Sequence, residues 1–207
     1  MSQLRKTFVD LLAKFHGNDG LIGKLWIEIE ENYSGKERHY HTLHHLDKML
    51  QYLAEAKYKI QDWDVLLFSV YYHDIVYDPS RADNEEKSAQ FAAQRMTQMG
   101  ILSGMINKCT GQILATKSHQ STGDNDTDYL LDADLSILGQ SWEKYSEYCE
   151  NIRKEYTIYP DVLYNTGRKK TLEHFLAMER IFKTDFFFKR FDCQARENIK
   201  KEIGTLG

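Results

Sequence analysis

Only two prolines, Pro79 and Pro160, occur in this chain of 207 residues. Proline lacks a backbone donor and breaks the interior of a helix, so a chain with so few prolines can form many uninterrupted helices. Leucines at 43, 46, 50 and 53 repeat at the spacing of one helix face, and similar patterns recur along the sequence. We therefore expect an all-α fold, a bundle of helices joined by short connections.

Capping residues and glycines divide this pattern into ten expected helices. Ser2 caps the first and Thr42 the third, breaks are expected at residues 16–20 and 78–83, and residues 120–128 read as a mobile loop. The segment 63–73 is apolar on nearly every side, so we expect a central, buried helix there. The first expected helix runs to about residue 15. The others cover 21–33, 42–53, 63–73, 84–98, 103–118, 130–138, 142–156, 171–182 and 193–203.

Composition narrows the class of protein. A length of 207 residues suits one domain, 1–207, and the 42% apolar and 28% charged residues are ordinary for a soluble chain. The net charge of −4 argues against a nucleic-acid coat, which needs a basic face. No segment has the length of a membrane span or the pattern of a signal peptide. The three cysteines are widely separated, so we expect free thiols and a cytoplasmic protein.

The residues best suited to chemistry are histidines and aspartates set among apolar residues. His41 and His45 lie four residues apart, on one face of a helix if both are helical. His73 and Asp74 end the most apolar segment of the chain, where a carboxylate is costly unless a cation or hydrogen bonds compensate it. A metal ion bound by imidazole and carboxylate is one such compensation. The alternative is an aspartate that only accepts backbone hydrogen bonds.

A second acidic pair lies within the apolar segment 129–138. Asp132 and Asp134 are two residues apart, so they point to different sides of a helix. Asp134 borders the apolar face formed by Leu131, Leu135 and Leu138, whereas Asp132 lies three residues before Leu135. Spacing alone only favours Asp134 as the buried carboxylate.

Together these segments resemble the HD superfamily of metal-dependent phosphohydrolases, in which a histidine, a His-Asp doublet and a later aspartate lie on helices of one bundle. Here the pattern reads His45, then His73-Asp74 after 28 residues, then Asp134 after 60 more. The resemblance implies an HD-type bundle with these four residues as metal ligands and the metal-site core at about 38–138.

The cyclic-nucleotide phosphodiesterases, which share this core, give a finer resemblance. Residues 40–45 (YHTLHH) look like their Tyr-His-Asn-x-x-His segment, 114–119 (LATKSH) like a helix with a histidine near the metals, and 133–136 (ADLS) like their Ala-Asp-Leu-Ser. Carried over, His41 becomes the general acid, His45 a ligand, and Asp134 the ligand in preference to Asp132. We do not identify the glutamine and aromatic clamp that hold a purine in those enzymes, so cyclic-nucleotide specificity is not implied.

The most extensive resemblance is to a bacterial group of small, stand-alone predicted HD phosphohydrolases, whose substrate is unsettled. The similar segments are 38–45 (RHYHTLHH), 73–77 (HDIVY), 84–89 (NEEKSA), 131–135 (LDADL), 153–156 (RKEY) and 167–168 (GR). The resemblance therefore covers most of the chain.

The expected activity is hydrolysis of a phosphate ester of a nucleotide or another small molecule by metal-activated water. Two imidazoles and two carboxylates suit one or two ions of Mn, Fe, Co, Ni or Zn, and Mg less well. His41 or His119 would protonate the leaving oxygen, and Asp74 or Glu85 would orient the water. The residues expected to bind the substrate phosphate are Lys117, Arg153 and Arg168.

Two other functions stay open: a non-catalytic metal- or nucleotide-binding regulatory module, and an HD-type di-iron oxygenase that would also use His44 and His119. A homodimer is possible, with residues 186–188 and Phe191 forming either core or dimer contacts.

Overall fold

A computed structural model describes residues 2–15 and 18–206, and within these residues it contains helices and no strand. The all-α prediction is therefore confirmed. The two 3-10 helices are η1 (Lys57–Lys59) and η2 (Leu135–Gly139). The α-helices are α1 (Gln3–Leu12), α2 (Asp19–Asn32), α3 (Leu43–Glu55), α4 (Trp63–Tyr72), α5 (Asn84–Gln98), α6 (Ser103–Ala115), α7 (Asn125–Asp134), α8 (Trp142–Glu155), α9 (Asp161–Ala177) and α10 (Asp185–Thr205).

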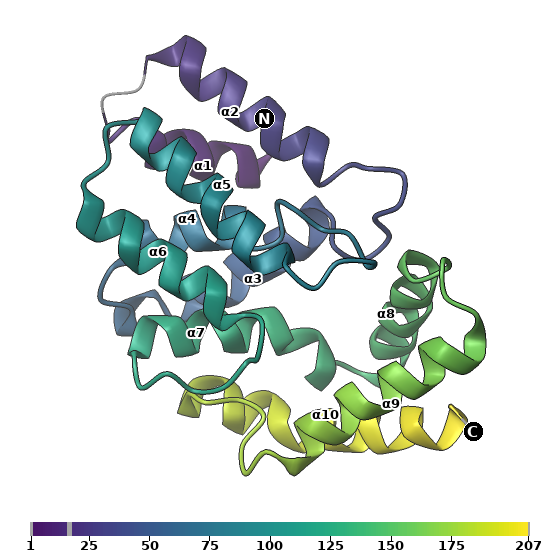
Figure 1. Ribbon diagram of the computed structural model, residues 1–207. Helices are drawn as coiled ribbons and strands as arrows, with labels where there is room; N and C mark the ends of the chain where they lie inside the picture. The colour runs from purple at the N-terminus through teal and green to yellow at the C-terminus, as the bar shows by residue number, and fades with distance from the viewer. Residues whose placement is uncertain (1, 16–17, 207) are drawn as a thin grey trace.

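Helix α4 lies at the centre of the N-terminal group of helices (Figure 1). It begins where the Asp62 side chain accepts a hydrogen bond from the Val65 amide, and eight of its ten residues are buried, as its apolar sequence predicts. It packs against α1, α3, α5, α6 and α7. Because α4 ends at Tyr72, the core itself positions the following His73 and Asp74.

The helices α8, α9 and α10 form a C-terminal group on the other side of α7 and η2 (green to yellow in Figure 1). Helices α8 and α10 both contact η2. At Gly139, the last residue of η2, a Cβ atom would lie 2.4 Å from the Cβ of Phe191 in α10. Only glycine permits this close approach, which brings α10 against η2.

Several predicted boundaries are wrong. Helix α7 begins at Asn125, inside the expected loop 120–128, because the Asp124 side chain caps it by accepting from the Thr127 amide. Helix α9 covers 161–177 rather than 171–182. Its first turn shows no buried apolar face in the sequence pattern, because Val162 and Leu163 face solvent. Helix α10 starts at 185 rather than 193, with Thr184 as its cap.

Other boundaries agree with the sequence pattern. Helix α5 has the predicted bounds, and Ser2 caps α1 as expected. Of the expected break at 16–20, residues 19 and 20 are helical, whereas His16 and Gly17 lie outside the described residues. Phe187 and Phe191 are buried in the core, as one of the two readings proposed. Across 2–15 and 18–206, the helices are too short or too polar to cross a bilayer.

Candidate metal centre

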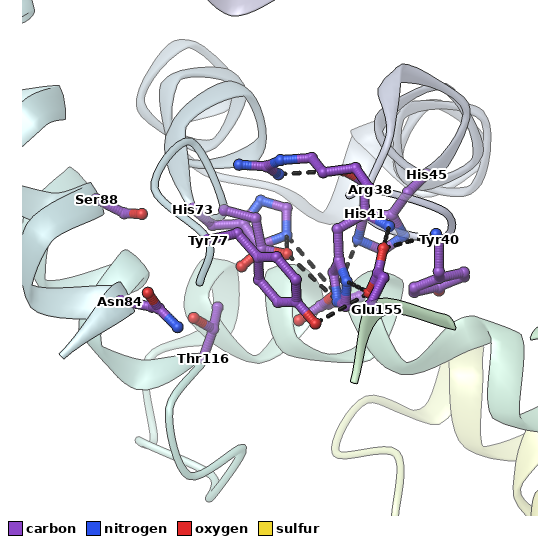
Figure 2. A network of polar contacts seen from close by, with 12 residues as sticks. Arg38, Tyr40, His41, His45, His73, Tyr77, Asn84, Ser88, Thr116 and Glu155 are labelled. Carbon is purple, nitrogen blue, oxygen red and sulfur yellow. Dashed lines mark hydrogen bonds and ion pairs between the residues drawn. The ribbon is translucent and has the colours of Figure 1, made fainter. Parts of the chain in front are cut away.

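Four side chains from three helices converge at the end of α4. His45 lies in the first turn of α3, His73 and Asp74 follow the last residue of α4, and Asp134 is the last residue of α7. Each offers one ligand atom, and these atoms all lie within 4.8 Å of one another, which is close enough to hold a single metal ion. Figure 2 shows the rings of His45 and His73 in this cluster, with His41 beside them.

The shortest contacts in the cluster join imidazole nitrogens to carboxylate oxygens. The Nε2 atom of His45 lies 3.0 Å from Oδ1 of Asp134, and the Nε2 atom of His73 lies 3.1 Å from Oδ2 of Asp74 and 3.7 Å from Oδ1 of Asp134. Two carboxylates this close to each other repel unless a cation or donated hydrogens lie between them. The arrangement therefore needs either bound protons or a metal ion.

Two observations favour a metal ion. The Nε2 atoms of His45 and His73 are buried, and their contacts with Asp134 and Asp74 are close but do not have the geometry of hydrogen bonds. The Nδ1 atom of His73 lies 3.0 Å from the Val70 carbonyl oxygen, to which it can only donate, so the Nε2 lone pair faces the cluster. In metal sites, a hydrogen bond from the ring nitrogen that does not bind the metal fixes the orientation of the histidine.

Electrostatics agree with this arrangement. Burial lowers the pKa of His73, but the charges of Asp74 and Asp134 outweigh burial and hold this pKa well above its usual value. Burial lowers the pKa of His45 below the usual value, which keeps its ring neutral. Although burial raises the pKa of Asp134, the close imidazoles of His119, His45 and His73 hold it well below its usual range. In the metal-free protein these carboxylates therefore favour a proton on His73, at the place that a metal ion would take.

The structure shows which of Asp132 and Asp134 belongs to the cluster, a choice that spacing alone did not decide. The carboxylate of Asp132 points away from the cluster and accepts hydrogen bonds from the amides of Lys183 and Thr184, both at 2.7 Å, and from the Thr184 hydroxyl. Asp132 therefore holds the segment before α10, and Asp134 belongs to the cluster.

His119 joins the cluster from the end of α6. Its Nε2 atom lies 2.9 Å from Oδ2 of Asp134. Its φ is +52°, the only positive value of a non-glycine residue in the described chain. This left-handed conformation costs on the order of 1 kcal/mol, so surrounding contacts hold it in place.

His41 is held by a residue that the sequence analysis did not assign. The Nδ1 atom of His41 lies 2.7 Å from Oε2 of Glu155, and its Nε2 atom lies 3.9 Å from Oδ2 of Asp74. The other oxygen of Glu155 accepts the backbone N–H groups of His39, Tyr40 and His41 at 2.7–3.0 Å. Figure 2 shows Glu155 between His41 and the Tyr77 hydroxyl, which also donates to it at 2.9 Å.

A signal for Glu155 was present in the sequence. Tyr145, Tyr148, Ile152 and Glu155 recur at helical spacing on the inner face of α8, and Glu155 is only 3% exposed. An acid on an apolar face was the spacing argument that favoured Asp134, and it applies equally to Glu155. Burial raises the pKa of this carboxyl, but the hydrogen bonds with His41 and the backbone outweigh burial and lower it to about 2.

The cluster opens into a cavity of about 770 Å³ between the metal-site core and the helices α8 and α9. Asp74, Asp134, His41 and His119 form the polar end of this cavity, and Glu85 and Lys117 also line it. Aromatic side chains also line the cavity, namely Tyr148, Tyr156, Tyr164 and Phe175.

The three residues expected to bind phosphate are placed differently. The Lys117 ammonium lines the cavity and contacts Glu86 and, at 4.0 Å, Glu85. Arg168 also lines the cavity, but its guanidinium pairs with Glu202.

Arg153 is not brought to the site. Its guanidinium pairs with Asp161 at 2.6 Å and donates to the carbonyl oxygens of Tyr156 and Tyr159. His44 is exposed and lies outside the cluster, so it is not a further ligand there. The three cysteines are free thiols, as expected.

Comparisons of the chain with protein-family models, with curated proteins and with solved structures give no match.

Proposed function

We propose that this protein is a metal-dependent phosphohydrolase of the HD type, with His45, His73, Asp74 and Asp134 as its metal ligands. One observation carries the proposal: these residues, up to 89 positions apart in the chain, bring their ligand atoms within 4.8 Å of one another. The two buried Nε2 atoms support it, because they lie close to carboxylate oxygens without hydrogen-bond geometry, whereas a purely structural cluster would satisfy them with hydrogen bonds.

The donor set indicates the class of ion. Two imidazole nitrogens and two carboxylate oxygens suit Mn, Fe, Co, Ni or Zn better than Mg, which prefers oxygen ligands and water. When bound, such an ion lowers the pKa of water and offsets negative charge on phosphoryl oxygens.

The role of His41 follows from its contacts. Glu155 accepts the Nδ1 hydrogen, which leaves Nε2 at the polar end of the cavity, beside Asp74. A histidine held in this way can carry a second proton at Nε2 and donate it to a leaving oxygen, as a general acid. Glu155 does not touch the substrate; it fixes the ring and stabilises its positive charge.

Other groups of the cavity wall serve binding. Lys117 lines the cavity, and because its ion pair with Glu86 is exposed and weak, its ammonium can turn to an anionic substrate; Glu85 lies next to it in the first turn of α5. His119 contacts Asp134 and lines the same end, so it positions that carboxylate or donates a second proton. A cavity of about 770 Å³ falls within the range of small-molecule sites, which supports a nucleotide or a compound of similar size.

The experiment is a metal-reconstitution assay. Metal-stripped protein is supplied separately with Mn, Fe, Co, Ni, Zn and Mg and tested on phosphomonoesters, nucleotides and cyclic nucleotides. We expect metal-dependent release of phosphate or of a nucleoside monophosphate, lost in both His73→Ala and Asp134→Asn. Equal activity in native protein and in both variants contradicts the proposal. Stoichiometric metal binding with no turnover favours the regulatory module instead, and oxygen-dependent turnover with iron favours the oxygenase.

A further inference from the structure

Arg168 lines the cavity and is held there by a buried ion pair. Its Nε and Nη2 atoms donate to the two carboxylate oxygens of Glu202 in α10 at 2.8 and 3.1 Å, and Nη1 donates to the Tyr148 hydroxyl at 3.0 Å. The side chains of Arg168 and Glu202 are only 9% and 6% exposed. Glu202 also accepts from the Tyr145 hydroxyl, so three helices fix the guanidinium in place.

This pairing changes what Arg168 can recognise. The positive charge of the guanidinium is matched by the negative charge of Glu202. The pair is therefore neutral, and it gains little interaction energy from contact with a phosphate group. A guanidinium has five N–H groups, and only three of them donate within the described chain. The two that remain are donors on a rigid, planar group that lines the cavity. Such a group suits uncharged acceptors, such as carbonyl oxygens and ring nitrogens.

Aromatic rings connect Arg168 with the metal centre. The Tyr148 ring lies 5.1 Å from the guanidinium carbon of Arg168 and 4.6 Å from the Tyr40 ring, and the Tyr40 ring lies 5.0 Å from that of His45. All three side chains Tyr40, Tyr148 and Arg168 line the cavity. A molecule that reaches from the ligands to Arg168 therefore passes over aromatic surface, against which a planar ring stacks favourably.

We propose that Arg168 is the specificity residue of this cavity and that it donates hydrogen bonds to the carbonyl-bearing edge of a nucleobase whose phosphate lies at the metal centre. The preferred bases are those with adjacent acceptors, such as the O6 and N7 atoms of guanine, whereas the amino group of adenine opposes a donor. This assignment of the substrate class rests on the proposed function for the phosphate end of the site.

The test is ligand binding to metal-free protein, in which no turnover occurs. Guanosine 5′-monophosphate, adenosine 5′-monophosphate and ribose 5-phosphate are titrated into ¹⁵N-labelled protein, and the Arg168 Nε–Hε resonance and the dissociation constants are followed by NMR. Because removing Arg168 alone leaves Glu202 buried and unpaired, the variant is the double substitution Arg168→Met with Glu202→Gln. Arg153→Met is the matched control, since Arg153 also pairs with a carboxylate and stacks on a tyrosine but lies outside the cavity.

Native protein and the Arg153→Met control should bind guanosine 5′-monophosphate about tenfold or more tightly than ribose 5-phosphate, and the Arg168 resonance of native protein should shift only with the former. The double variant should lose that difference while its affinity for ribose 5-phosphate stays the same. A double variant that keeps the native preference overturns the inference, as does native protein that prefers the adenine nucleotide. The hydrolase proposal fails separately, by absence of metal-dependent turnover, whatever the outcome of these titrations.

Discussion

The Nδ1 atom of His41 lies 2.7 Å from Oε2 of Glu155, a residue 114 positions later in the chain. This contact ties the segment before α3 to the end of α8, and it fixes which nitrogen of His41 faces the cavity. The replacement Glu155→Gln keeps an oxygen for the backbone amides but removes the negative charge that stabilises a protonated His41. We expect kcat to fall by about 10²-fold, with metal content unchanged.

Steady-state kinetics and metal analysis of the purified variant measure this effect. Glu143→Gln, at an exposed position of the same helix, is the control and should behave as native. A variant at Glu155 with native kcat would remove His41 from the proposed role of general acid.

Replacement by asparagine should affect metal binding at Asp134 and the stability of the fold at Asp132. Asp134→Asn removes a ligand charge, so we expect stoichiometric metal binding to be lost. Asp132→Asn should keep the metal but unfold more easily, by about 1–3 kcal/mol, because its carboxylate accepts three hydrogen bonds in the segment before α10. Metal analysis and urea denaturation of both variants check this, and loss of metal in Asp132→Asn alone would reverse the assignment.

Metal affinity should increase with pH. The pKa of His73 is raised because, against the effect of burial, the carboxylates of Asp74 and Asp134 favour its protonated form. An entering ion must displace that proton, so binding tightens as the pH rises through the raised pKa of His73. At a hundredfold excess over Kd, the ion should stabilise the fold by about 2.7 kcal/mol. Calorimetric titration at several pH values is the measurement, and a pH-independent Kd would contradict it.

Glu155 should also contribute to resistance to acid. Its pKa falls from 4.5 to about 2 in the folded protein, because the hydrogen bonds with His41 and the backbone amides outweigh the opposing effect of burial. The resulting stabilisation is complete above about pH 4.5 and is lost as the pH falls toward 2, with a total of about 3 kcal/mol. Urea denaturation of native protein and Glu155→Gln across this range should show a difference that shrinks with acidity. A constant difference would mean that the carboxylate is not specially stabilised.

Lys117 and Arg153 should differ in their effect on substrate binding. Lys117 lines the cavity, whereas Arg153 donates to Asp161 and to backbone carbonyls outside it. We expect Lys117→Gln to raise KM several-fold, because an ammonium beside an anionic substrate is lost, and Arg153→Gln to leave KM unchanged. The kinetics of the two variants, measured at low ionic strength, separate these outcomes. A higher KM in Arg153→Gln alone would place the substrate elsewhere.

Much of the site could be predicted because its chemistry conflicts with its surroundings. Asp74 and Asp134 drew attention as carboxylates within apolar segments, and the structure brings their oxygens to the nitrogens of His45 and His73. The buried helix α4 was equally visible, since an apolar run needs no knowledge of its neighbours.

The remainder depends on tertiary packing. The charge of Arg168 is matched by Glu202, which lies 34 residues away on another helix. No local sequence pattern predicts that ion pair. Arg153 has the same side chain and a similar stacking contact, yet it is not among the residues that line the cavity. The sequence shows that each arginine lies on a helix. The direction of each guanidinium depends on how α8, α9 and α10 pack against one another.

The division of the cavity between two groups of helices has a consequence for how the protein can diversify. All four proposed ligands precede α8, whereas Tyr148, Glu155, Arg168 and Glu202 follow from the last third of the chain. Changes to α9 can therefore remodel the far wall of the cavity while the ligand-bearing helices stay intact. In evolution, the ion and the preference for a substrate can be inherited independently, with Glu155 as the contact that any new C-terminal segment must preserve.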